Sequence, residues 1–129
     1  VLNGGHTIHW WCKLQSRIAL SSCEAELNAT LIGGKEGRYH RFMAQEFGDE
    51  VNLELRTDAS AARGVIMRQG FGKIRHLSTQ QLWIQENVKE GGFVINKIPR
   101  SENLSDALTH PWTASDLPFW NSMGLRFIP

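Results

Sequence analysis

The sequence is short of cysteine and of long apolar runs, and each shortage excludes a class of protein. Two cysteines among 129 residues, Cys12 and Cys23, are too few for a disulfide framework, and their spacing is not that of a metal-binding motif. A reduced intracellular compartment, the cytoplasm, is therefore the simpler prediction. No apolar run reaches the length of a membrane span, so we expect no membrane partner.

Net charge is also low, because 14 Lys and Arg nearly balance 13 Asp and Glu to give +1. Total charge therefore does not indicate a nucleic-acid partner, and such a partner would have to bind to local clusters of basic residues. The hydrophobic content of 41% is ordinary for a globular protein, and the length suits one domain with its own core. We predict a single domain over residues 1–129, on which residues 112–129 pack as a C-terminal extension.

Apolar periodicity and turn residues predict an α+β or mixed α/β fold. A helix is expected from Ser21, because Ser21 and Glu24 form a capping-box pair. Its apolar stripe continues to Phe47, and we expect Gly33, Gly34 and Gly37 to allow close approach to a sheet. The predicted elements are strands at 7–13, 17–20, 51–58 and 93–98, and helices at 21–47, 60–67, 77–89 and 103–109.

Three acidic residues lie at the ends of predicted elements. Glu26 is near the start of the long helix, Asp58 ends a strand, and Asp106 lies in the short last helix. Carboxylates that converge from rigid elements are what a site needs to hold Mg²⁺ against a phosphodiester. Acidic residues near helix starts also have a purely structural explanation, because they cap free N–H groups and offset the helix dipole. Asp58 could cap the helix that follows it, and Glu24 could complete its capping box, so both interpretations stay open on the residues alone.

Three stretches in a fixed order carry a resemblance to a known family. They are LSSCEAELNAT (20–30), TDASAA (57–62) and NLSDALTHP (103–111), against a family pattern similar to LSSTEAEYMAL, DNQSAI and LADILTKP. KIRHL (73–77) stands where the family has TKHID. From about Gly5 to Pro111 the chain thus resembles the ribonuclease H domain of copia-type (LTR) retrotransposon Pol polyproteins.

The resemblance implies a ribonuclease H-like mixed sheet flanked by helices, and an endonuclease that hydrolyses the RNA strand of RNA–DNA hybrids during reverse transcription. It implies two Mg²⁺ or Mn²⁺ ions held by the catalytic residues Glu26, Asp58 and Asp106. Lys73, Arg75 and His76 would contact substrate phosphates. The implied partners are the RNA–DNA hybrid and a reverse transcriptase domain in the same polyprotein, in the cytoplasm or a virus-like particle.

One part of the family pattern has no match. The family's first catalytic aspartate lies on a central strand before the Gly4-Gly5 turn, so the resemblance implies a fragment without that strand. We therefore predict little or no nuclease activity for this chain alone. Two alternatives stay open: a non-catalytic remnant or domesticated module that binds nucleic acid or protein, and a plain α+β domain whose acidic residues are caps.

Three cations on the long predicted helix, Lys35, Arg38 and Arg41, share one face at spacings i, i+3 and i+6. Such a row could follow a nucleic-acid backbone or form an ordinary solvated helix face.

Overall fold

The computed structural model describes residues 1–16, 18–68, 70, 79–106, 111, 113–116 and 121. They form an α+β protein, as predicted, whose chain divides into two compact units. The smaller unit comprises residues 1–14 and 104–129, and the larger one residues 15–103. In the smaller unit, β1 (Leu2–Asn3) pairs antiparallel with β2 (His6–Thr7).

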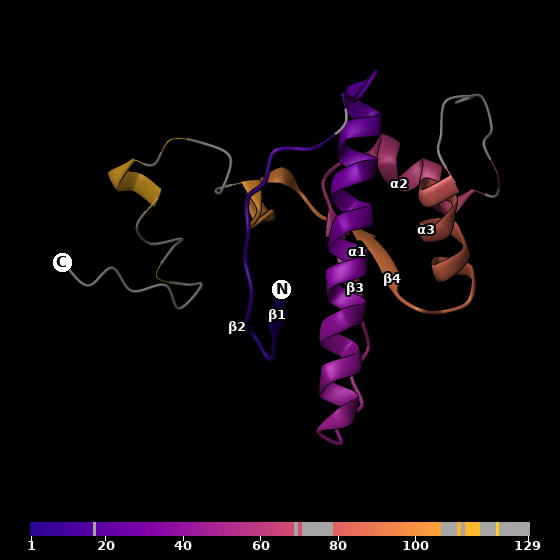
Figure 1. Ribbon diagram of the computed structural model, residues 1–129. Coiled ribbons are helices and arrows are strands. Elements are labelled where there is room, and N and C mark those ends of the chain that lie inside the picture. Colours follow the sequence, from indigo (N-terminus) through magenta and orange to yellow (C-terminus); the bar gives the residue numbers. More distant parts are fainter. Residues whose placement is uncertain are drawn as a thin grey trace. The chain divides into compact units, whose positions relative to one another are not determined.

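The long helix α1 (Ser22–Glu46) begins where the capping box predicts (Figure 1). The Ser21 hydroxyl accepts a hydrogen bond from the Glu24 backbone N–H at 3.2 Å. The Glu24 carboxylate reaches back one residue further than in the usual box and accepts from the Leu20 N–H at 2.8 Å. Gly48, with φ at +86°, ends the helix in the left-handed conformation that glycine adopts without strain.

The larger unit is built on two parallel strands, β3 (Glu54–Thr57) and β4 (Val94–Lys97). Parallel strands need a long crossover connection, and here it contains α2 (Ser60–Met67) and α3 (Thr79–Lys89). The predicted helix at 60–67 is confirmed at both ends, and the predicted strands at 51–58 and 93–98 are confirmed with narrower bounds.

The core of this unit gathers apolar side chains from α1, α2 and α3, from β4 and from Phe93 just before it. Its buried members are Leu27, Leu31, Ala62, Val65, Ile66, Ile84, Phe93 and Ile95. Two helix glycines face the sheet at close range, as predicted: a Cβ on Gly34 would lie 3.4 Å from Leu55 Cδ1, and one on Gly37 would lie 2.7 Å from Leu53 Cδ1. Gly33 faces open space instead.

Buried side-chain amides join the helices by hydrogen bonds. The Gln85 side chain donates to the carbonyls of Val65 (2.8 Å) and Gly70 (3.1 Å) and accepts from the Gly70 N–H (2.9 Å). The Gln81 amide donates to Asn28 Oδ1 at 2.9 Å. Because each buried amide finds partners, its desolvation is compensated.

The predictions for the start of the chain are largely wrong. Of the strand predicted at 7–13 only Thr7 lies in a strand, and Ile18 to Leu20 lie in none. The alternation of Ile8 and Trp10 is that of a strand, but a strand also needs a neighbour for its backbone groups. Among the residues described, β2 has only the two-residue β1 as its partner.

Predictions for the end of the chain are tested only in part. Short 3₁₀ helices lie at Arg100–Glu102 and Ala114–Asp116. Of the helix predicted at 103–109, Asn103 to Ser105 lie in no helix, and residues 107–109 are outside the described residues. So are most of residues 112–129, and both the single-domain assignment and the packing of this extension stay predictions. No helix within the described ranges is both long enough and apolar enough to cross a bilayer.

Candidate functional site

Asp58 directly follows β3 and is half-buried. Helix α2 begins after Ala59 as its N-cap residue, and no side chain caps it. The turn between strand and helix is instead held by Thr57, whose hydroxyl accepts from the Ala59 N–H at 3.1 Å. The structural alternative for Asp58, a helix cap, is therefore not what the structure shows.

The two glutamates at the start of α1 have different environments. Glu24 is engaged in the capping interactions and so has the structural role expected of it. Glu26 lies two residues further on with an exposed side chain. Its neighbour Leu27 is fully buried, with 0% of its surface exposed, and this anchors the helix at the point from which Glu26 projects.

Glu26 and Asp58 lie at the same end of the larger unit. Gly34 of α1 faces Leu55, whereas Gly37 faces Leu53, so α1 runs antiparallel to β3. From the Gly34–Leu55 contact, Glu26 is eight residues toward the start of the helix, about 12 Å. Asp58 is three residues toward the end of the strand, about 10 Å in the same direction.

The structure does not test the grouping of the remaining predicted site residues with Glu26 and Asp58. Asp106 is half-buried and belongs to the smaller unit, so its grouping with Glu26 and Asp58 stays a prediction. Lys73, Arg75 and His76 lie outside the described residues, and their contact with substrate stays a prediction as well.

Two features of this end were missed by sequence reasoning. Thr57 is buried, with 6% of its surface exposed, and shapes the turn that carries Asp58. The Asn28–Gln81 hydrogen bond ties α1 to α3 two residues beyond Glu26. A Thr before the Asp at a strand end is a recognisable signal, because its hydroxyl can hydrogen-bond a backbone N–H two residues on. No periodicity marks the amide pair.

The exposed face of the parallel sheet carries a polar network. Glu54 accepts from Arg56 at 3.0 Å and from the Asn96 amide at 2.8 Å. These hydrogen bonds, with Arg56 the larger influence, hold the pKa of the Glu54 carboxyl below its ordinary value. The network gives the solvated face of the two strands its polarity, and it contains neither candidate carboxylate.

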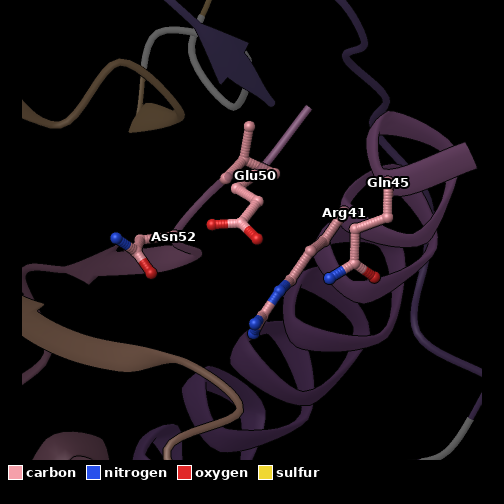
Figure 2. A pocket seen from close by; sticks show the side chains of 5 residues that line it. Arg41, Gln45, Glu50 and Asn52 are labelled. Atoms are coloured by element: carbon pink, nitrogen blue, oxygen red, sulfur yellow. The ribbon is translucent and has the colours of Figure 1, made fainter. Parts of the chain in front are cut away.

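A pocket of about 300 Å³ lies at the other end of the larger unit (Figure 2). It is lined by Arg41, Gln45, Glu50, Val51 and Asn52. Arg41 is fifteen residues beyond Glu26, roughly 22 Å along α1, and its Nη1 already donates to the Gly92 carbonyl at 2.9 Å. The pocket is therefore separate from the carboxylates.

Comparison with known proteins finds similarity to a mobile-element protein. The chain is 31% identical over 107 residues to the "Retrovirus-related Pol polyprotein from transposon TNT 1-94" of Nicotiana tabacum. The chain is similar to a retrotransposon Pol polyprotein. The alignment covers 81% of the chain but 8% of that polyprotein, and it supports a retrotransposon-related role. No family model matches the chain, and no solved structure matches it.

Proposed function

We propose that this chain is part of the ribonuclease H of a retrotransposon Pol polyprotein, which hydrolyses the RNA strand of RNA–DNA hybrids. The observation that carries the proposal is that Glu26 and Asp58 lie at one end of the larger unit while α2 has no side-chain cap for Asp58 to supply. The similarity to a Pol polyprotein supports the same origin.

In this proposal Glu26, Asp58 and Asp106 hold Mg²⁺ or Mn²⁺. Carboxylate oxygens suit such hard cations, and both Glu26 and Asp58 project from elements fixed by buried neighbours, Leu27 and Thr57. When bound, the ions would supply a water nucleophile and stabilise the charge that develops on the phosphate. The protein's own part is to present the carboxylates from a rigid helix and strand.

Lys73, Arg75 and His76 are proposed to contact the phosphates of the hybrid. Recognition of an RNA strand would use its 2′-hydroxyls across a wide, shallow minor groove. The proposed partner is a reverse transcriptase domain of the same polyprotein, in the cytoplasm or in a virus-like particle.

Metal titration of this chain tests the proposal directly. Mn²⁺ binding would be followed by calorimetry in the wild type, in Asp58→Asn and in Asp49→Asn. The Asp58→Asn exchange removes a proposed ligand, and we expect affinity to fall by more than about tenfold, the smallest loss typical even of an outer-shell partner. Asp49→Asn removes an exposed carboxylate just beyond the C-terminal end of α1 and should change nothing.

Equal affinity for Mn²⁺ in the wild type and Asp58→Asn would contradict the proposal and favour a non-catalytic module of the same fold. Nuclease activity is the second readout. We expect little or no cleavage of a labelled hybrid by the 129-residue chain alone, because the first aspartate of the implied site has no match in it. Cleavage should be gained in a longer polyprotein segment and lost there with Asp58→Asn.

A further inference from the structure

Three cations form a row along α1 that the candidate metal site does not use. Lys35, Arg38 and Arg41 follow one another at intervals of three residues, so the row is about 9 Å long. We call these three residues the α1 cationic ridge. Along the helix it begins nine residues after Glu26, roughly 14 Å away, and is therefore distinct from the proposed carboxylate site.

The side chains of the ridge are held in place by neighbouring elements. Lys35 Nζ lies 6.0 Å, and Arg38 Cζ 5.8 Å, from the centre of the Trp83 ring on α3. Arg38 also donates a hydrogen bond to Asn87 Oδ1, and Arg41 donates to the Gly92 carbonyl at 2.9 Å. Such contacts order long side chains that would otherwise lose conformational freedom on binding.

None of these contacts of the three cations is an ion pair. The partners are an aromatic ring, an amide oxygen and a backbone carbonyl, all of them neutral. Across the part of the chain that the structure describes, an ion pair joins Arg56 to Glu54 and none includes the ridge, although the exposed Glu50 lines the same pocket as Arg41. A protein of net charge +1 thus concentrates three fixed cations on one helix face.

We propose that the α1 cationic ridge binds the phosphate backbone of a nucleic acid, outside the proposed catalytic site. One strand of a duplex carries a phosphate about every 3.4 Å along the axis, so the ridge spans two to three of them. Arg and Lys positioned by their own protein are suited to such contacts. The choice of a nucleic acid over an acidic protein rests on the function proposed above.

The aromatic ring of the cluster has a supporting role in this proposal. Trp83 is half-buried, and its ring lies 6.4 Å from that of Phe93 as well as against the two cations. A ring covered in this way orients Lys35 and Arg38 and is not available for stacking on a base. The contact we infer is therefore electrostatic and independent of sequence.

Binding of a fluorescently labelled RNA–DNA hybrid, measured by anisotropy in EDTA over a series of salt concentrations, tests the ridge. For Lys35→Gln and Arg41→Gln we expect the slope of log K against log salt to fall by about 0.9 for each phosphate that the variant no longer neutralises. Arg41→Lys keeps the charge and should retain the slope. Lys89→Gln makes the same charge change on another face of α3, six residues beyond Trp83, and should bind like the wild type.

The outcomes separate this proposal from the proposed function. Because EDTA removes metal, the salt slopes of Lys35→Gln and Arg41→Gln do not depend on the outcome of the metal titration, so either proposal can fail without the other. Unchanged slopes in Lys35→Gln and Arg41→Gln, or an equal loss in Lys89→Gln, would overturn the ridge proposal. Binding of poly-glutamate with no binding of the hybrid would overturn it too, in favour of an acidic protein partner. Circular dichroism melting of each variant confirms that it is folded.

Discussion

The two halves of α1 differ in what holds them. The two halves are unequal and comprise residues 22–37 and 38–46. All the buried residues of the helix, Leu27, Leu31, Gly34 and Gly37, lie in the first of them. In the second half Tyr39 and Phe42 are 59% and 57% exposed, and the fixed contacts are the hydrogen bonds of Arg38 and Arg41. The first half, which carries Glu26, is positioned by packing, whereas the second is positioned by polar contacts at its side.

This difference matters for function because packing fixes a side chain's position more firmly than exposed hydrogen bonds do. A carboxylate that must meet a partner from β3 benefits from the first kind of support. A row of cations that contacts a polymer backbone tolerates the second kind, since phosphate contacts demand charge rather than one fixed geometry.

The strongest test of the comparison is Leu27→Ala in the packed half. This change empties a fully buried site and should lower the free energy of unfolding by about 2–5 kcal/mol. This loss of stability is measured by denaturant unfolding at about 25 °C, the temperature to which such energies refer. Leu20→Ala makes the same exchange at a side chain that is 73% exposed, just before the helix, and should cost less than about 0.5 kcal/mol. Similar losses in the two variants would contradict the assignment of Leu27 to the core.

Two glycine substitutions in α1 should have different effects on the stability of the protein. Gly33→Ala adds a methyl group in open space and should stabilise the helix by roughly 0.5–1 kcal/mol. Gly37→Ala places its Cβ 2.7 Å from Leu53 Cδ1, so the side chain of Leu53 must move and the gain is cancelled. We expect thermal unfolding to rank Gly33→Ala above the wild type and Gly37→Ala below Gly33→Ala by about 1 kcal/mol or more. Equal gains would show that helix and sheet are further apart than described.

The smallest effect is expected in the second half of the helix. Phe42→Gln replaces an exposed aromatic side chain and should change the free energy of unfolding by less than about 0.5 kcal/mol, in the same denaturant measurement. A loss of several kcal/mol would instead place Phe42 in a packed interface, and the two halves of α1 would then be alike.

The helix itself was predictable from the sequence, and its buried face was predictable in part, through Gly34 and Gly37. Ser21 and Glu24 predict its start, and the capping hydrogen bonds confirm it. The apolar stripe through Phe42 and Phe47 predicts a helix but misleads about burial, because the face toward the sheet after Leu31 is marked by glycines. Glycine has no side chain to contribute to a hydrophobic pattern, so this packing was predicted from the glycines themselves and not from the apolar periodicity.

The candidate site also has features that the sequence predicts and features that it does not. Glu24 as a capping residue follows from local chemistry, and the structure confirms it. That Asp58 does not cap α2 depends on the Thr57 hydroxyl and on where the helix begins, which no spacing rule determines. The strand predicted at 7–13 was wrong because alternation describes the faces of a strand and says nothing of the neighbour it requires.

The glycine contacts of α1 also fix how many residues the chain can have between its N-cap and the sheet. One residue inserted between Leu31 and Gly33 would turn the rest of the helix by about 100° and bring Glu36 to the place where Gly37 meets Leu53. One residue deleted there would bring Lys35 to the place of Gly34, against Phe93. Relatives of this protein should therefore vary in length after Arg41 and keep a constant count of residues from Ser21 to Gly37.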